Sequence, residues 1–508
     1  MNSRELARDV DVGGREGFKL KRAASVAIDL GAESCRVSLL RWDDDSPQLS
    51  VVHRFANGPI RRGNSLVWNI EGIIGGVTEG LCHCAEIATE GIASIGVDGW
   101  AVDYVRLADD GRPLGNPRCY RDERTIEAER RVHQLVSRHD LYELTGIQFL
   151  RFNTLYQLYA DQQDGVDPHA RWINLPEYIL FRLGGQKVAE YTNATHTQLV
   201  DLNTGNWCQQ IFDRSGLDLS AAPQIVESGA IVGRLRGAIA ELPAFQSTLL
   251  IAPACHDTAS AVAGIPAEGD DWAFISSGTW SLVGTLLDTA CATHHALSKN
   301  FTNLGAVGKK VCFLKNVNGM WLLQQCLETW REQGHKWTIP DLVHACSALQ
   351  PPTTYFDVDD PDLLLPGNIP EKIRAQLKKT QNGNPLSSSD TVADTANLIF
   401  HGLAKRYAEV LKDIAAVTGK KIQKLYIVGG GNRNTLLNRL TAEQTGLEVI
   451  LGPAESSTIG NFAVQLATLE GGWKSSVGVS SNTVSAWARA LTGRYHSERE
   501  TVSAESMA

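Results

Sequence analysis

Residues 26–36 read Val-Ala-Ile-Asp-Leu-Gly-Ala-Glu-Ser-Cys-Arg, and the prediction of the fold begins with them. The first five residues have the apolar composition of a buried strand, which would carry Asp29 near its carboxyl end. Gly31 to Cys35 predicts a tight turn, and Arg36 to Trp42 predicts a returning strand. Such a turn points several backbone N–H groups to one side, which suits the terminal phosphates of a nucleotide. Asp29 would then hold Mg²⁺ through water, although a plain hairpin turn with a solvated aspartate would give the same pattern.

The pattern of strand, glycine turn and strand occurs again in the second half of the chain. Trp272 to Thr285 contains two apolar runs around Ser276-Ser-Gly-Thr279. Each hairpin lies near the start of its own half, and their separation matches the length of one domain. The hydroxyl groups of the second turn add to its backbone donors. A Ser/Gly sequence that serves only to make a tight turn is the simpler explanation.

A third turn lies at a junction between a strand and a helix. The strand is predicted at Lys424 to Val428 and the helix at Asn434 to Thr445, with three glycines and an asparagine between them. This order predicts a parallel sheet with right-handed crossovers. Gly430 and Gly431 would let an adenine or ribose approach the backbone, whereas close packing of the helix on the strand would also need glycine. The dinucleotide fingerprint GxGxxG is absent.

Two places carry acidic residues at the ends of buried strands. The strand Leu249 to Ala252 is followed by Cys255-His-Asp-Thr258, where Asp257 suits a general base. Phosphoryl transfer to an alcohol needs a carboxylate that orients the hydroxyl and takes its proton, but an aspartate that caps the following helix is the alternative. Asp98 and Asp103, near the end of another buried strand, would bind sugar hydroxyls or cap the strand end.

The length of 508 residues and the hydrophobic content of 43% predict two domains. We expect an α/β protein with two lobes and a cleft between them. The first lobe, residues 25–265, would hold the sugar site and a phosphate loop, and the second, residues 266–490, would hold the nucleotide. Residues 1–24 are expected to be a disordered leader and residues 491–508 a polar tail.

The net charge of −9 argues against nucleic acid or an anionic membrane as the main partner, because either calls for a basic patch. Apolar runs long enough to span a membrane are absent, and the charged leader lacks the apolar core of a signal peptide. Ten cysteines without a CxxC pair indicate buried thiols in a reducing compartment. We expect a cytoplasmic protein that binds small molecules and is a monomer or a weak homo-oligomer.

Several stretches together resemble the FGGY family of carbohydrate kinases over roughly residues 25–490. Within the family, the run Phe-Asn-Thr-Leu-Tyr-Gln-Leu at 152–158 is similar to the rhamnulokinases, whereas many other members carry a lysine–tryptophan signature there. The stretches that carry the resemblance are Val26 to Ala32, Tyr120 to Asp122, Gly146 to Leu150, Phe152 to Leu158, Glu190 to Thr195, His256 to Ala261, Ser276 to Ser281 and Ile427 to Gly431.

The resemblance implies two actin- or hexokinase-like lobes with ATP between them. It also implies that ATP, with Mg²⁺, phosphorylates O1 of L-rhamnulose to give L-rhamnulose 1-phosphate and ADP. Asp257 would be the base, His256 and Thr258 would help to hold the sugar, and Ala101 would line the sugar site. The residues implied to contact the nucleotide are Ala32, Glu33, Ser34, Cys35, Arg36, Thr279, Asn316, Gln324, Gly430 and Gly431.

Two positions depart from the family pattern. Cys35 stands where the phosphate loop usually has glycine, and a positive φ there would cost about 1–2 kcal/mol. Gly99-Trp-Ala101 replaces the usual Thr-Trp-Gly, so that Ala101 would narrow the sugar pocket by a methyl group.

Three other functions compete with this one. The first is a kinase for another ketose or deoxy sugar, such as fuculose or xylulose. The second is a nucleotide-regulated binding protein on the same fold that turns over no sugar. The third, a Rossmann dehydrogenase, lacks its fingerprint in this chain.

Overall fold

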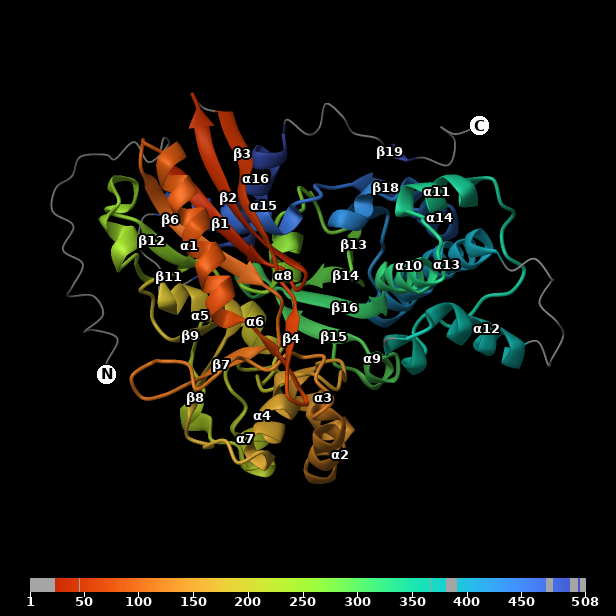
Figure 1. Ribbon diagram of the computed structural model, residues 1–508, viewed down its shortest axis with the longest axis horizontal. Coiled ribbons are helices and arrows are strands. Elements are labelled where there is room, and N and C mark those ends of the chain that lie inside the picture. Colours follow the sequence, from red (N-terminus) through yellow and green to blue (C-terminus); the bar gives the residue numbers. More distant parts are fainter. Residues whose placement is uncertain are drawn as a thin grey trace.

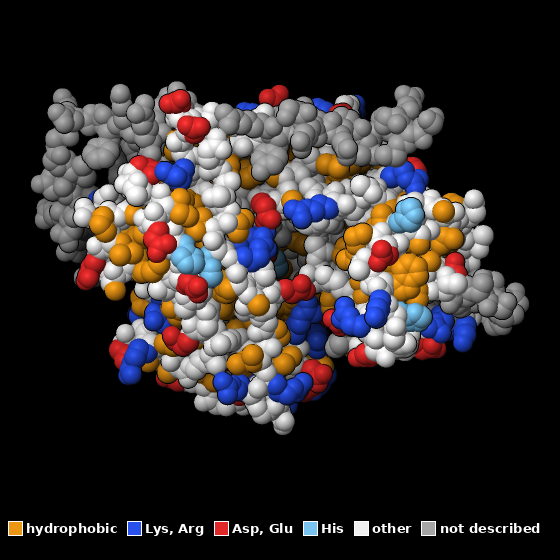
Figure 2. Space-filling model, turned by 45° about the horizontal axis from the view of Figure 1, so that its top comes forward, with side chains coloured by type: hydrophobic (Ala, Val, Ile, Leu, Met, Phe, Trp, Pro, Cys, Tyr) orange, Lys and Arg blue, Asp and Glu red, His pale blue; other side chains and the backbone are white. Residues whose placement is uncertain are grey.

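The structure is a computed structural model that describes residues 23–44, 46–365, 367–380, 391–471, 478–493 and 501–502. Figure 1 shows two main sheets with helices packed around them. In the space-filling view, acidic and basic side chains are interleaved over the visible face (Figure 2).

The first sheet is formed by the first half of the chain. Its strand order is β11 (Ala230–Arg234), β12 (Leu249–Ala252), β6 (Ile92–Gly99), β1 (Ala24–Leu30), β2 (Ser34–Asp43) and β3 (Ser46–Ala56). Strand β1 is buried along its whole length, because it is paired on both edges and covered on both faces. This explains why its sequence is continuously apolar up to Asp29.

The second sheet is formed mainly by the second half of the chain. Its strand order is β15 (Thr302–Gly305), β16 (Val311–Asn318), β14 (Trp280–Leu287), β13 (Trp272–Ser277), β17 (Lys424–Val428), β18 (Glu448–Leu451) and β19 (Thr501–Val502). Strands β13, β17 and β18 are parallel, which confirms the parallel unit predicted from the sequence.

The two sheets repeat one arrangement, as the sequence predicted. Strand β1 forms an antiparallel hairpin with β2, and it pairs in parallel with β6, which pairs in parallel with β12. Strand β13 has the same relation to β14, β17 and β18. Each hairpin turn therefore lies at the edge where its parallel strands end, which is where α/β sheets bind ligands.

A pair of helices rich in small residues connects the two sheets, because one of them contacts strands of both. Helix α8 (Asp257–Ala263) contacts β6 of the first sheet and β13 of the second, and its Ala259 and Val262 belong to the apolar clusters that contain Ala27 and Phe274, respectively. Helix α15 (Ser456–Glu470) packs against α8 so closely that a Cβ at Gly460 would lie 1.7 Å from the carbonyl oxygen of Ser260. Only glycine allows this approach.

Helix α15 belongs to the first sheet by packing, although it lies near the end of the chain. It contacts β1 and β6, and Figure 1 shows it with α16 (Ser481–Thr492) beside the strands that begin the chain. The predicted boundary between residues 265 and 266 separates the two sheets. A contiguous second lobe of residues 266–490, however, includes two helices that pack with the first.

The remaining helices cover the outer faces of the sheets or form the lower part of the molecule in Figure 1. Helix α1 (Ile70–Ile87) packs on β2 and β3, and α13 (Val392–Thr418) packs on β14 and β16. The others are α2 (Thr125–Leu135), α3 (Arg138–Thr145), α4 (Thr154–Gln163), α5 (Leu175–Arg182), α6 (Tyr191–Thr195), α7 (Gln209–Ser215), α9 (His294–Ser298), α10 (Trp321–Glu332), α11 (Ile339–Ser347), α12 (Ile369–Thr380) and α14 (Thr435–Thr445). Short strand pairs are formed by β4 (Pro59–Arg62) with β5 (Ser65–Trp68), β7 (Tyr104–Leu107) with β8 (Arg171–Asn174), and β9 (Val188–Glu190) with β10 (Gln224–Val226).

Element boundaries differ from the sequence prediction at two functional places. The returning strand β2 begins at Ser34 rather than at Arg36, because Ser34 already pairs with Ala56 of β3. Helix α8 begins at Asp257 itself rather than at Ala259. Most of the predicted leader, residues 1–24, and of the predicted tail, residues 491–508, lies outside the described residues.

All ten cysteines are free thiols, and most of them are buried, as their lack of pattern predicted. Over the described ranges, the helices do not combine the length and apolar character that crossing a membrane requires.

Candidate active site

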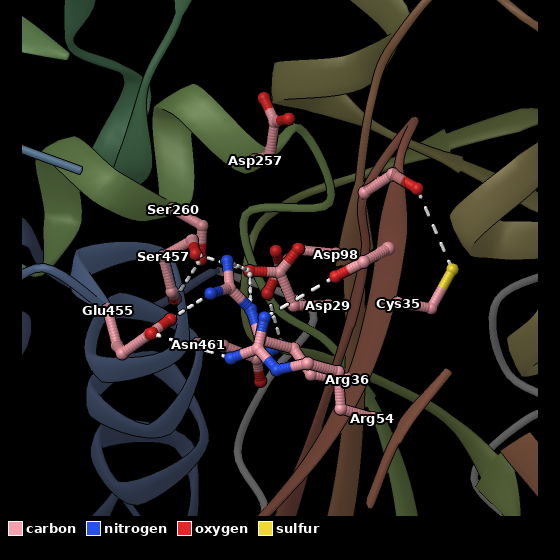
Figure 3. Close-up of polar contacts among 12 residues, drawn as sticks. Asp29, Cys35, Arg36, Arg54, Asp98, Asp257, Ser260, Glu455, Ser457 and Asn461 are labelled. Atoms are coloured by element: carbon pink, nitrogen blue, oxygen red, sulfur yellow. Dashed lines mark hydrogen bonds and ion pairs between the residues drawn. The ribbon is translucent and has the colours of Figure 1, made fainter. Parts of the chain in front are cut away.

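Asp29 lies at the carboxyl end of β1, where its carboxylate is held from two sides (Figure 3). Arg36 of β2 donates two hydrogen bonds to Oδ2, at 3.1 Å from Nε and 2.7 Å from its terminal nitrogen. The hydroxyl of Ser457, from α15, donates to the same oxygen at 2.5 Å. Arg36 is also ion-paired with Glu455, which immediately precedes α15. Asp29 therefore connects the first hairpin to a helix from the far end of the chain.

Asp98 lies directly beside Asp29 in the register of β6 with β1. It is fully buried, and its Oδ2 accepts a hydrogen bond from the amide of Asn461 at 2.6 Å. Its Oδ1 has no hydrogen-bonding partner within the described part of the chain. Burial, and then the charge of Asp29, raises the pKa of Asp98 well above its ordinary value.

Asp257 is the first residue of α8, and its side chain remains 37% exposed. The hydroxyl of Thr258 donates to its Oδ1 at 3.2 Å, and Nε2 of His256 lies 3.3 Å from the same oxygen. Desolvation, and then the negative charge of Asp29, raises the pKa of Asp257 to about 7. A carboxylate with a pKa near neutrality is suited to taking up a proton from a hydroxyl.

The first hairpin turn runs from Gly31 to Glu33. A Cβ at Gly31 would lie 2.4 Å from the carbonyl oxygen of Ser34, so the turn needs glycine for its close approach. Cys35 already belongs to β2, is fully buried and is not among the described residues with positive φ. The backbone strain that a positive φ would cause at Cys35 does not arise, because this residue has the extended backbone of a strand. Burial raises the pKa of the Cys35 thiol to about 12.

The second hairpin turn meets the first. The hydroxyl of Thr279 donates to Oε1 of Glu33 at 3.5 Å. The third glycine turn packs against the same hairpin, because a Cβ at Gly431 would lie 2.0 Å from Oγ of Ser277. Gly429 begins that turn with φ of 84°, which favours glycine. The structure thus brings together the three turns that the sequence assigned to one nucleotide.

Two further residues implied to contact the nucleotide lie on either side of the β16–α10 connection. Asn316 of β16 donates to Oε1 of Gln148, at 2.9 Å from its side chain and 3.2 Å from its backbone. Gln324 lies in the first half of α10 with a half-buried side chain.

Asp103 is fully buried and accepts four hydrogen bonds from the protein. Its Oδ2 accepts from the indoles of Trp68 (2.6 Å) and Trp100 (3.1 Å) and from the backbone of Tyr120 (3.1 Å), and its Oδ1 accepts from Gln157 at 3.0 Å. Burial raises its pKa to about 6. These contacts make Asp103 a support for the aromatic residues around it.

The aromatic residues form a series that reaches from the first half of the chain to the second. Ring centroids are 4.5 Å apart for Trp68 and Trp100, 5.3 Å for Tyr120 and Phe152, and 6.4 Å for Phe152 and Trp280. Ala101 follows directly after Trp100 and is 7% exposed.

Sequence reasoning missed the polar face of α15. Ser457 contacts Asp29, Asn461 contacts Asp98, and Gln465 donates to the carbonyl oxygen of Val26 at 3.0 Å. These three polar residues recur every four positions along a mostly buried helix, so they share one face. The four-residue spacing of these polar side chains is the sequence signal that could have predicted this polar face.

A cavity of about 690 Å³ lies between the 148–150 segment and the second sheet. Trp280, Asn316, Lys405 and Arg406 are among its lining residues. Trp280 of the second hairpin lines this cavity, but Asp29, Asp98 and Asp257 do not, so the cavity is distinct from the candidate catalytic centre.

The described residues contain no group of three or more His, Cys, Asp or Glu arranged to hold a metal ion. A cation at Asp29 would therefore need further ligands from a substrate or from water.

Two related sheets with turns that meet beside three carboxylates define a two-lobed α/β protein with an actin-like ATPase fold. Two family comparisons then give its membership: the N-terminal domain of the FGGY family of carbohydrate kinases matches residues 24–264, and the C-terminal domain matches residues 273–469. The chain belongs to the FGGY family of carbohydrate kinases.

Solved structures of low sequence identity share this fold. A ligand-bound xylulose kinase from Lactobacillus acidophilus matches with a TM-score of 0.74 at 17% identity, over 94% of this chain and 97% of the other. A gluconate kinase from the same organism matches with a TM-score of 0.71 at 16% identity, over 94% and 97%. A Plasmodium falciparum glycerol kinase with ADP matches with a TM-score of 0.69 at 15% identity, over 92% of each chain.

Proposed function

We propose that the protein transfers the γ-phosphate of ATP to O1 of L-rhamnulose and releases L-rhamnulose 1-phosphate and ADP. The observation that carries the proposal is the contact between Glu33 and Thr279, which joins the two hairpin turns beside Asp29. Asp257 is near enough for the charge of Asp29 to raise its pKa. A phosphate bound at the turns would therefore have a basic carboxylate beside it.

The nucleotide would be held mainly by backbone groups. The N–H groups of residues 32–36 and the hydroxyl of Thr279 would bind the terminal phosphates. The turn at Gly430 and Gly431 leaves room for the ribose or adenine because it has no side chains. Asn316 and Gln324 would complete the nucleotide site from the second lobe.

Magnesium fits the donors at this position. Mg²⁺ is usually bound by one or two carboxylates together with phosphate oxygens and water. The carboxylate of Asp29, at the carboxyl end of β1, is such a donor. When bound, Mg²⁺ would neutralise charge on the phosphates, with Asp29 as its protein ligand through water.

The sugar would bind at the start of α8. Asp257 would accept the proton of the sugar hydroxyl while that oxygen attacks the γ-phosphorus and ADP leaves. His256 and Thr258 would help to place the sugar, and Ala101 would line the other side. Asp98, being buried with a raised pKa, would contribute a neutral carboxyl group.

The assignment of L-rhamnulose as the substrate rests on the similarity of residues 152–158 to the rhamnulokinases. A second candidate is another ketose, such as xylulose or fuculose. Xylulose is favoured by the similarity in fold to xylulose kinases. We propose a cytoplasmic enzyme that works as a monomer or weak homo-oligomer on these small molecules.

A panel of sugars in an ADP-release assay with ATP and Mg²⁺ tests the proposal. We expect the highest kcat/KM with L-rhamnulose, and NMR of the product should show phosphate on O1. A preference for xylulose or fuculose would change the proposed substrate but leave the proposed mechanism unchanged. ADP release that no sugar stimulates would contradict sugar kinase activity and favour a nucleotide-regulated binding protein.

A further inference from the structure

The segment from Glu190 to His196 packs against the loop that precedes the proposed base. Glu190 is fully buried, and its Oε2 accepts hydrogen bonds from the backbone N–H of Cys255 at 2.9 Å and from the hydroxyl of Thr192 at 2.6 Å. The backbone N–H of His256 donates to the hydroxyl oxygen of Thr192 at 3.3 Å. These contacts fix the backbone before the base, but the function proposed above leaves the segment without a role.

His196, at the end of this segment, packs against the ring of His256. The ring centroids are 4.5 Å apart and the planes are inclined by 76°, which is an edge-to-face contact. His196 is 8% exposed and His256 is 4% exposed. Nδ1 of each ring is buried without a hydrogen-bonding partner among the described residues. The position of the His256 ring is therefore set by packing at this end rather than by a hydrogen bond.

The other end of the His256 ring faces the base. Its Nε2 lies 3.3 Å from Oδ1 of Asp257, and the hydroxyl of Thr258 donates to that same oxygen. Both contacts engage Oδ1. Oδ2 is the oxygen that remains for the sugar.

We propose that His196 is a positioning residue: its ring holds the imidazole of His256 against Oδ1 of Asp257, so that Oδ2 faces the reacting hydroxyl. The proposal rests on the sugar kinase function and deepens it. His196 acts only through His256.

The electrostatic surroundings of His196, His256 and Asp257 are consistent with this arrangement. Burial, and then the charge that His196 would carry, lowers the pKa of His256 well below its ordinary value, and burial lowers the pKa of His196 to about 4. The other charged or titratable groups that act on Asp257 are Asp29, Asp98 and Arg36. A neutral His256 with its proton on Nε2 would place that N–H dipole near Oδ1, 3.3 Å from Nε2, which favours the ionised base.

The first test compares His196→Ala with His196→Phe, using the sugar that wild type phosphorylates best. In His196→Ala we expect kcat to fall by about 10- to 100-fold, since small displacements of catalytic groups have effects of this size. The acid limb of kcat/KM should move to higher pH, because the Nε2–H dipole of His256 would no longer be held beside the ionised form of Asp257. His196→Phe keeps an aromatic ring, so kcat should stay within about threefold of wild type and the limb should stay in place.

His133 offers a matched control. It is also packed edge-on against aromatic rings, those of Tyr156 and Phe149, and its Nδ1 is also buried without a partner in the described chain. His133→Ala should lower the melting temperature and leave the acid limb unchanged. A similar limb shift in His133→Ala, or an equal loss in His196→Phe and His196→Ala, would overturn the proposal.

A second readout does not depend on turnover. Histidine ¹⁵N spectra of the full chain should show the His256 proton on Nε2, with no titration between about pH 5.5 and 8 in wild type. In His196→Ala this signal should move toward averaged tautomers, and His196→Gln serves in its place if the alanine variant does not fold. An unchanged His256 signal would overturn the proposal even if no sugar is phosphorylated, whereas a missing sugar activity with the expected spectra would contradict only the proposed function.

Discussion

Thr279 and Glu33 come from hairpins in different halves of the chain, and the hydroxyl of Thr279 donates to Oε1 of Glu33 across 3.5 Å. The contact marks the place where the two lobes approach each other beside Asp29. A phosphate held by both turns would bridge the lobes. Binding of nucleotide and sugar would then favour a closed arrangement that keeps water away from the transferred phosphate.

Replacing the proposed base tests the centre of the mechanism. Asp257→Asn should lower kcat by about 10²- to 10⁴-fold, because the amide cannot accept the hydroxyl proton. Binding of ADP, measured by calorimetry, should remain near wild type. Asp270→Asn, at an exposed acidic residue, is the control and should leave both quantities unchanged. Near-normal turnover in Asp257→Asn would remove Asp257 from the proposed chemistry.

The pH dependence of activity should report the same carboxylate. The pKa of Asp257 is raised to about 7, and the base works only when ionised. Activity should therefore fall as pH decreases through 7, and kcat/KM at pH 6 should be about tenfold below its alkaline plateau. A plateau that extends down to pH 5 would show that the working base has an ordinary carboxylate pKa.

Asp103→Asn separates support of the aromatic residues from direct contact with the sugar. The amide keeps only one acceptor oxygen and turns its NH₂ group toward a donor, either the indoles or Gln157, so the free energy of unfolding should fall by about 1–3 kcal/mol. The KM for sugar should rise together with this loss, while ADP affinity stays unchanged. A higher KM at wild-type stability, measured by urea unfolding, would instead indicate a direct contact between Asp103 and the sugar.

Gly460→Ala tests the crossing of α8 and α15. The new Cβ would meet the backbone of Ser260, which cannot move aside without separating the helices. We expect a loss of about 1–3 kcal/mol in unfolding free energy or more, together with lower kcat. Gly75→Ala in α1 is the control, because its Cβ would meet nothing within 4 Å and the variant should be as stable as wild type or more so.

The hairpins could be predicted from the sequence because their information is local. Residues 26–36 contain the buried strand, the glycine turn and the return, and the same order at Trp272 to Thr285 gave the repeat. The meeting of the two turns followed from placing both at strand ends. Cys35 shows the limit of this reasoning, since only the pairing of β2 with β3 reveals that it lies inside a strand.

The partners of the carboxylates could not be predicted, because they lie far away in the sequence. Ser457 and Asn461 reach Asp29 and Asp98 only after both sheets have formed and α15 has packed on the first. The partners of Asp103 could not be predicted either, because an aspartate that follows a strand gives no sign that two indoles and a side-chain amide will donate hydrogen bonds to it.

The position of α15 has a consequence for biosynthesis. While the ribosome is still adding the second half, the nascent first half holds Asp98 without Asn461 and Asp29 without Ser457. The strands around β1 also lack the helix that covers them. The first lobe thus reaches its final form only after residues 456–470 have been synthesised, and until then its uncovered apolar face is prone to aggregation.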